Sequence, residues 1–176
     1  MIITIFMIAI ALSMDAFSLS LLYGTLGMKT KQRVELSTIV GIYHLVMPLT
    51  GYLIGNSILR ILPIKTNIVA GIIFLILGLE MLTSVKKEEI VTELKTITAF
   101  LIFGFTVSID SFSIGITLSS ISNSVMIPPI IFALTSSIFT YIGISIGKVL
   151  NKNFGKYSIL LGAIILIILA IIYLFA

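Results

Sequence analysis

Two short motifs place an aspartate, with serines around it, inside runs of otherwise apolar residues. The first is Ser13-Met14-Asp15-Ala16-Phe17-Ser18, and the second, ninety-five positions later, is Ser108-Ile109-Asp110-Ser111-Phe112-Ser113. A carboxylate at the centre of a bilayer costs roughly 2.5–3.5 kcal/mol on insertion scales, so an aspartate there indicates a functional site. We therefore expect Asp15 and Asp110 to carry the chemistry of this protein.

The composition of the chain predicts that these motifs lie in a membrane. The chain is 59% hydrophobic and only 10% charged, whereas a soluble domain carries about 25% charged residues. It has no cysteine, which excludes disulfides and thiolate metal sites. The net charge of +4 is typical of basic cytoplasmic loops, and we expect no nucleic-acid partner.

Six apolar runs are long enough to cross a bilayer, because a spanning helix needs about 20 apolar residues. They cover residues 2–24, 35–57, 66–84, 97–118, 127–147 and 157–176. The runs are continuous and do not alternate, which predicts helices and not a β-barrel. The first run has no positively charged start and contains Asp15, so we interpret it as a spanning helix and not as a signal peptide. The sequence thus predicts an all-α integral membrane protein with six transmembrane helices.

The basic residues predict the orientation of these helices. Nine of the eleven Lys and Arg residues fall in the loops after the first, third and fifth runs: Lys29, Lys31, Arg33, Lys86, Lys87, Lys95, Lys148, Lys152 and Lys156. The opposite side has only Arg60 and Lys65. Since cytoplasmic loops carry the excess of Lys and Arg, we expect a multi-pass protein of the cell membrane with both termini extracytoplasmic.

The sequence also contains an internal repeat. Residues 11–21 align with 106–116, Gly51-x-x-x-Gly55 matches Gly143-x-x-x-Gly147, and Gly71 matches Gly162. Each half has three spans, an odd number, so the halves face opposite ways. We predict one membrane domain, 1–176, built from two inverted three-helix repeats, 1–85 and 96–176. Secondary transporters use this plan, with the binding site near the midplane between the repeats.

Helical geometry selects the neighbours of each aspartate, because positions three, four and seven away share its face. Around Asp110 these positions hold Thr106, Ser113 and Thr117, and around Asp15 they hold Ser18. We take these hydroxyls as candidate metal ligands. The alternative for each is a hydrogen bond to its own helix backbone or close helix packing.

The second and third spans add two further candidates. Pro48 has no N–H, so the carbonyl of His44 loses its usual partner and, together with the imidazole, becomes a candidate ligand near the bilayer centre. The alternative is a packing kink, with His44 bonded to a neighbouring serine. Glu80 is either a gate or proton-relay carboxylate, or a side chain that extends to the cytoplasmic interface near Lys86 and Lys87; we favour the second interpretation.

The ligand types predict what such a site binds. Carboxylate, hydroxyl and carbonyl oxygens suit Mg²⁺, Ca²⁺ and Mn²⁺, and His44 would favour manganese among them. Two neighbouring carboxylates in a medium of low dielectric are not both ionised when the site is empty, and metal binding releases their protons. We therefore expect antiport, with a divalent cation leaving and protons entering. The residues alone leave the metal open.

The motifs resemble those of the small manganese efflux pump (MntP) family. The matching stretches are Ser-Met-Asp-Ala-Phe-Ser-Leu-Ser from residue 13, Met-Pro-Leu-Thr-Gly from residue 47 and Ser-Ile-Asp-Ser-Phe-Ser-Ile-Gly from residue 108. The resemblance implies an inner-membrane exporter of Mn²⁺ that is not an enzyme and has no tightly bound cofactor, with Asp15 and Asp110 in its site.

Three alternatives to an exporter stay open at this point. A related sporulation-associated branch has similar motifs without a clear transport role. Intramembrane aspartyl proteases also carry paired aspartates, but they resemble a Gly-x-Gly-Asp context that Asp15 and Asp110 lack. A packing or scaffold protein of the membrane is the third. The oligomeric state, with a homodimer as one candidate, is open too.

Overall fold

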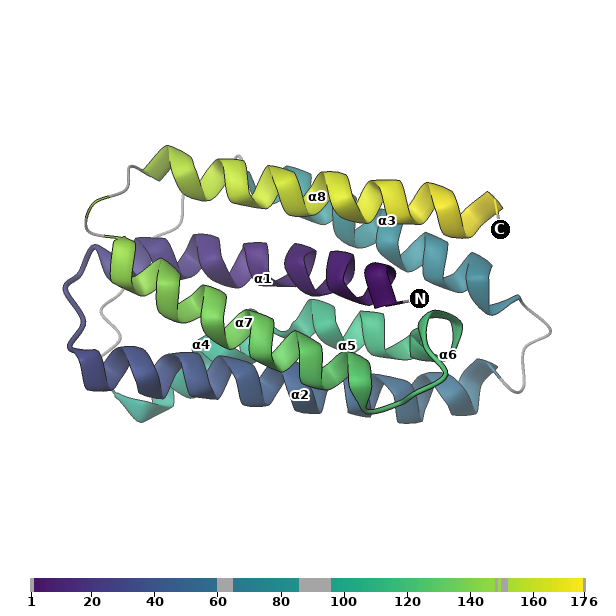
Figure 1. The fold of residues 1–176 in the computed structure, drawn as a ribbon, viewed down its shortest axis with the longest axis horizontal. Coiled ribbons are helices and arrows are strands. Elements are labelled where there is room, and N and C mark those ends of the chain that lie inside the picture. The colour runs from purple at the N-terminus through teal and green to yellow at the C-terminus, as the bar shows by residue number, and fades with distance from the viewer. Residues whose placement is uncertain (1, 60–64, 86–95, 148, 150–151, 176) are drawn as a thin grey trace.

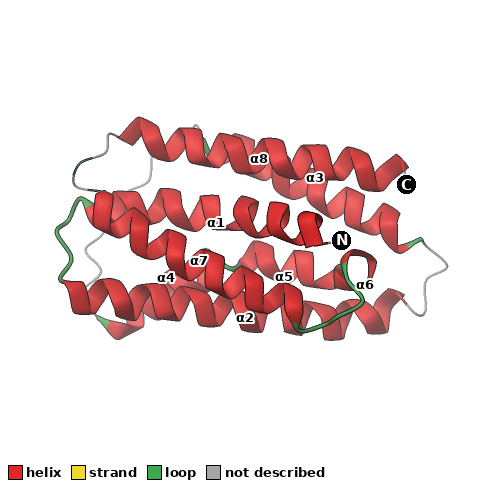
Figure 2. Ribbon diagram, viewed as in Figure 1, coloured by secondary structure: helices red, strands yellow, loops and turns green. Residues whose placement is uncertain are grey.

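Helices account for all the regular structure in the described part of the computed structural model, which comprises residues 2–59, 65–85, 96–147, 149 and 152–175 (Figure 2). The helices are α1 (Ile2–Gly24), α2 (Thr30–Leu59), α3 (Thr66–Ser84), α4 (Ile97–Thr106), α5 (Ile109–Ile116), α6 (Leu118–Ile121), α7 (Ile127–Ile146) and α8 (Lys152–Phe175). Within these ranges six segments are long and apolar enough to cross a membrane, with α4 and α5 counted as one. The predicted all-α, six-span membrane protein is confirmed.

The second span begins earlier than the apolar pattern predicts, at Thr30 instead of residue 35. Polar contacts support this extra turn. The backbone N–H of Lys29 donates to Oε1 of Gln32 over 2.9 Å, and Lys31 forms an ion pair with Glu35 over 3.7 Å. Such a pair at positions i and i+4 stabilises a helix that extends beyond the apolar core of a bilayer.

The fourth span is not the continuous helix that was predicted for residues 97–118. It is interrupted between Thr106 and Ile109, and again at Thr117. At the first interruption the N–H of Ser108 donates to Phe105 and that of Ser111 donates to Ser108, both three residues back instead of four. The hydroxyl of Ser108 also donates to the carbonyl of Phe105, over 3.0 Å. Hydroxyl side chains that bond the backbone compete with the helical ladder, which explains the break.

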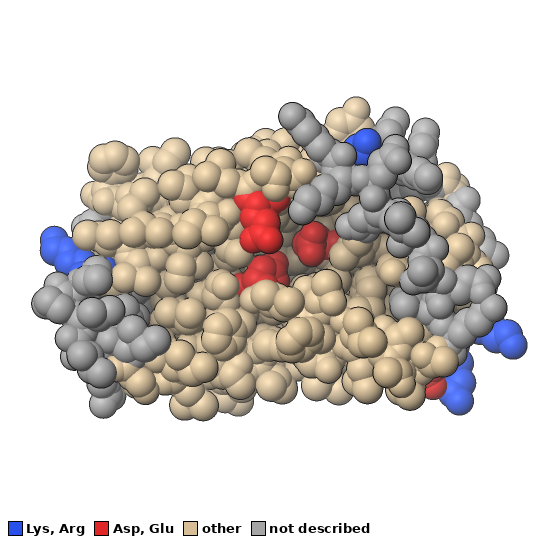
Figure 3. Space-filling model, turned by 180° about the vertical axis from the view of Figure 1, so that it is seen from behind, with Lys and Arg blue, Asp and Glu red and all other residues tan. Residues whose placement is uncertain are grey.

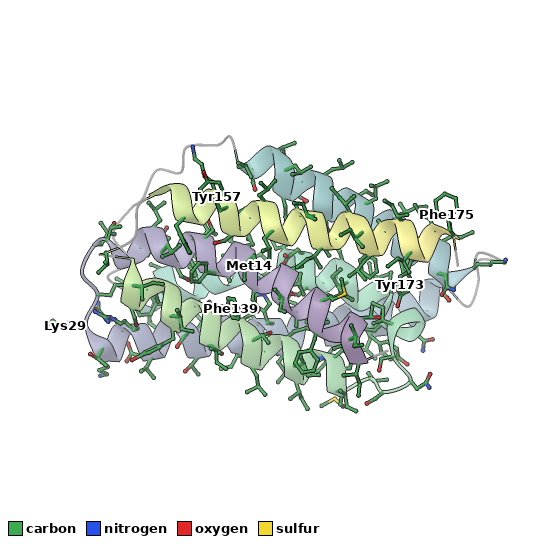
Figure 4. The ribbon with its side chains drawn as sticks, turned by 45° about the horizontal axis from the view of Figure 1, so that its top comes forward. Met14, Lys29, Phe139, Tyr157, Tyr173 and Phe175 are labelled. Carbon is green, nitrogen blue, oxygen red and sulfur yellow. The ribbon has the colours of Figure 1, made fainter. Side chains whose placement is uncertain are left out.

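The bundle has α1 at its centre and one poorly closed side. Helix α1 packs against α7 and α8, α2 packs against α7 and α4–α5, and α3 packs along α8 (Figure 1). By contrast, α5 touches α3 only sparsely. The start of α1 and the end of α8 lie at the same end of the bundle. Lys29, which precedes α2, lies at the opposite end from Phe175, and Met14 lies between them (Figure 4).

The two Gly-x-x-x-Gly pairs bring helix backbones into direct contact. A methyl group on Gly51 or Gly55 of α2 would overlap the backbone of Phe112 or Ile116 in α5. A methyl group on Gly143 of α7, or on Gly147 directly after this helix, would meet the backbone of Phe17 or Leu21 in α1. Small residues allow such close approach between membrane helices. Phe112 and Ile116 stand ninety-five positions after Phe17 and Leu21, so the two pairs make matching contacts.

Candidate metal site

A cavity of about 300 Å³ opens on the poorly closed side, between α3 and α4–α5, with α1 behind it. Its walls are formed by Asp15, Leu77, Glu80, Met81, Ser84, Thr106, Ile109, Asp110 and Ser113. Acidic side chains gather at a hollow in the middle of this face (Figure 3). Both aspartates of the repeated motif therefore line one cavity inside the membrane-spanning bundle.

Asp110 stands at the start of α5, directly after the break in the fourth span. It is the acidic residue of the first turn of this helix, and its Oδ1 accepts the backbone N–H of Ser111 over 2.8 Å. Backbone N–H groups at a helix start are not used within the helix and favour negative charge. The break thus gives Asp110 a local environment that a continuous helix would not provide.

Asp15 lies on an unbroken helix and is half-buried. Two residues earlier, Ser13 is fully buried; its hydroxyl donates to the carbonyl of Ala9 over 2.6 Å and lies 3.2 Å from the hydroxyl of Ser136 in α7. The contact between Ser13 and Ser136 links α1 to α7. Asp15 is near enough to Asp110 for Coulombic repulsion between the charged forms, and Glu80 acts on Asp110 in the same way but more weakly.

Two of the four predicted hydroxyl ligands line the cavity. Thr106 and Ser113 stand in its wall with Asp110. The Thr106 hydroxyl donates to Ile102 over 2.9 Å, which leaves its oxygen able to accept or to bind a cation. Thr117 is fully buried outside the cavity wall and donates to Ile114 over 2.9 Å. Ser18 lies under α8, where its hydroxyl is 2.7 Å from the position of a methyl group on Gly155.

His44 is fully buried in α2 and does not line the cavity. Its Nδ1 lies 3.0 Å from the carbonyl of Val40, and its Nε2 has no hydrogen-bond partner among the described residues. Helix α2 continues through Pro48, whose backbone packs against Gly115 of α5. The structure therefore does not bring His44 together with Asp15 and Asp110.

For Glu80 of α3, the sequence favours a place at the cytoplasmic interface over a role as a gate or proton-relay carboxylate. Glu80 stands in the cavity wall, in the same hollow as the two aspartates. Lys86 and Lys87, its expected neighbours at the interface, lie outside the described residues. The sequence does contain a signal for the role of Glu80, because a glutamate inside a membrane-spanning run indicates a functional site just as an aspartate does.

The cavity has the donor types of a hard-cation site without a preformed cage. Among the described residues, no three His, Cys, Asp or Glu side chains stand close enough together to hold a metal ion. Its carboxylate and hydroxyl oxygens suit Mn²⁺ or Mg²⁺. Liquid water occupies about 30 Å³ per molecule, so the cavity has room for an ion with part of its hydration shell.

Comparison with known proteins decides the family. A family described as "Putative manganese efflux pump" (Mntp) matches residues 27–174. A protein of Bacillus pumilus with the name "Putative manganese efflux pump MntP" is 34% identical over 173 residues, which cover 98% of this chain and 94% of that protein. The chain belongs to the MntP family. A Geobacillus thermodenitrificans MntP protein is likewise 34% identical, over 97% of this chain and 93% of its own length.

Membership of the MntP family confirms the resemblance found in the sequence. The family is named for manganese efflux, which is transport and not catalysis. It also agrees with the six candidate spans of a multi-pass membrane protein. No solved structure matches this chain.

Proposed function

We propose that this protein exports Mn²⁺ from the cytoplasm and that Asp15 and Asp110 bind the ion in the cavity. One observation carries the proposal: the two aspartates of the repeated motif come from α1 and α5 and line the same cavity in the middle of the bundle. Thr106 and Ser113 add neutral oxygen donors to the same wall. Water completes the coordination of the ion, as expected for a site that must also release it.

His44, Ser18 and Thr117 were candidates from the sequence and are not part of this open cavity. They join the coordination of the ion only if the helices move. His44 could contribute an imidazole nitrogen, because its Nε2 has no hydrogen-bond partner in the described part of the chain. A second subunit is not required by the proposed site, and a homodimer stays a prediction.

The transport cycle exchanges the cation for protons. Two carboxylates held close together in a medium of low dielectric are not both ionised at low cost, and the empty site therefore holds protons. A divalent cation favours two ionised carboxylates, so its binding releases protons. Exchange of two protons for one Mn²⁺ keeps the charge of the site constant and avoids much of the cost of moving an unpaired charge through the bilayer.

We infer that the two halves are inverted repeats, 1–85 and 96–176, in one membrane domain. The matching Gly-x-x-x-Gly contacts support this, since α2 packs on α5 as α7 packs on α1. The halves differ in one respect: α1 packs closely against α8, whereas α5 has few contacts with α3. In inverted-repeat transporters, exchange of two such arrangements opens the site to the other side.

The present arrangement corresponds to the state that is open toward the cytoplasm. The nine basic residues predict that the loop after α3 is cytoplasmic and that both termini are extracytoplasmic. The cavity wall uses Leu77, Glu80, Met81 and Ser84 from the half of α3 that leads into this loop. An exporter loads its ion from that side.

Manganese uptake into inside-out membrane vesicles tests the proposal. We expect uptake by vesicles that contain the full chain, and its loss in Asp15→Asn and in Asp110→Asn. Glu35→Gln is a matched control, because Glu35 pairs with Lys31 away from the cavity; this variant should transport normally. Uptake that survives both aspartate substitutions would overturn the assigned site.

A further inference from the structure

The three carboxylates of the cavity come from three different helices. Asp15 belongs to α1, Asp110 to α5 and Glu80 to α3. Helix α3 is anchored on α8, where methyl groups on Gly71 and Gly78 would meet Leu174 and Ile167. It has few contacts with α5. Few contacts therefore fix the distance between α3, which carries Glu80, and α5, which carries Asp110.

The charge of the cavity depends on what it holds. When Asp110 and Glu80 are both ionised and no cation lies between them, their like charges repel, which opposes approach of α3 to α5. A divalent cation between the carboxylates replaces this repulsion by attraction. Mn²⁺ accepts oxygen ligands readily, and a third carboxylate can replace a water of its shell.

The closed form of such a wall already exists in the other half of the molecule. Gly162 of α8 covers α1, because a methyl group there would lie 2.9 Å from the carbonyl oxygen of Ala11 and 3.2 Å from Cβ of Met14. Gly155 covers Ser18 in the same way, at 2.7 Å from its hydroxyl. The residues ninety-five positions after Ala11, Met14 and Ser18 are Thr106, Ile109 and Ser113. Those three line the open cavity.

From these observations we propose that Glu80 is a third ligand of the transported cation, supplied by α3 when this helix closes onto α4–α5. The ion bound by Asp15 and Asp110 attracts Glu80, and the movement covers Thr106, Ile109 and Ser113 as α8 covers their counterparts. This inference rests on the proposed manganese site, and it adds the residue that couples ion binding to closure of the cavity.

Mn²⁺ binding to the purified full chain in detergent, measured by electron paramagnetic resonance of free Mn²⁺, tests the ligand role. Loss of a group that supports a metal site lowers affinity about 10–100-fold, and we expect Glu80→Gln to weaken binding by at least about tenfold. Glu80→Asp, which keeps the charge on a shorter side chain, should lie between Glu80→Gln and the parent. Glu35→Gln, the same chemical change outside the cavity, should bind as the parent does.

Closure is tested by a disulfide across the cavity mouth. The chain has no cysteine, so Ser84→Cys with Ile109→Cys gives one defined pair of cavity-lining positions, from α3 and α5. We expect Mn²⁺ to increase the yield of this disulfide in the parent and in Glu35→Gln, and not in Glu80→Gln. Melting curves of each variant separate loss of folding from loss of the effect.

The outcomes separate this inference from the proposed function. If Asp15→Asn and Asp110→Asn lose Mn²⁺ binding while Glu80→Gln keeps both affinity and the Mn²⁺-dependent disulfide, Glu80 is a solvated side chain and the inference is wrong. If all three variants bind as the parent does, the manganese site itself is wrong.

Discussion

Ser18 and Ser113 occupy the same position in the two Asp-containing motifs, but only Ser113 lines the cavity. Ser18 lies against α8 at Gly155, where the two helices are in close contact. The two serines thus differ in their surroundings. Helix α8 packs over α1 at Ser18, whereas the cavity lies between α3 and α5 at Ser113. In an exporter that alternates between two such states, these serines should exchange environments.

Thiol labelling of single cysteines measures that exchange. We expect Ser113→Cys to react with a membrane-impermeant maleimide in inside-out vesicles, because it lines the cavity that we propose to be open to the cytoplasm. We expect Ser18→Cys to be protected by α8. During Mn²⁺ transport, Ser18→Cys should become reactive from the extracytoplasmic side. Equal reactivity of both positions under all conditions would contradict alternation between the halves.

The proposed proton coupling predicts how Mn²⁺ affinity depends on pH. Each proton released on binding makes the dissociation constant rise about tenfold per unit fall in pH. With two carboxylates protonated in the empty site, affinity should fall up to about 100-fold per pH unit in the acidic range. Asp15→Asn, which removes one titrating group, should reduce both the affinity and this slope. A slope of zero in the parent would exclude proton exchange.

The glycine contact between α2 and α5 predicts a large effect of added volume. Gly51→Val inserts a side chain where the carbonyl oxygen of Phe112 lies, and overpacking of a tight contact costs about 1–3 kcal/mol. Leu53→Val on the same helix is the control, because Leu53 is 67% exposed on the outer surface. We expect a clearly lower melting temperature in detergent for Gly51→Val alone. A melting temperature like that of Leu53→Val would contradict the close packing.

The buried imidazole of His44 predicts an unusual substitution effect. A buried polar group without a hydrogen-bond partner costs about 1–3 kcal/mol, and Nε2 of His44 has no partner within the described ranges. His44→Leu should therefore leave the melting temperature unchanged or raise it, since it removes this nitrogen and keeps an apolar side chain of similar size. A marked loss of stability would show that Nε2 has a partner in the membrane, such as a buried water.

The sequence by itself determined the class of this protein and the residues to examine. The apolar runs specify six helices because twenty apolar residues have one stable structure in lipid. The two Asp motifs stand out because charge inside such a run is costly, and so does their repetition at a spacing of ninety-five residues. These properties are local, and they do not depend on how the helices pack.

Only the tertiary structure decided which of these residues meet. Helical periodicity grouped Thr117 with Asp110, but hydroxyl–backbone bonds interrupt the fourth span and Thr117 lies outside the cavity. It also gave Ser18 and Ser113 equivalent positions, although Ser18 lies against Gly155 of α8 and Ser113 lines the cavity beside α3. Glu80 joins the aspartates through the placement of α3. The side of a helix that faces a cavity depends on contacts between residues far apart in the chain. A local sequence pattern does not specify these contacts.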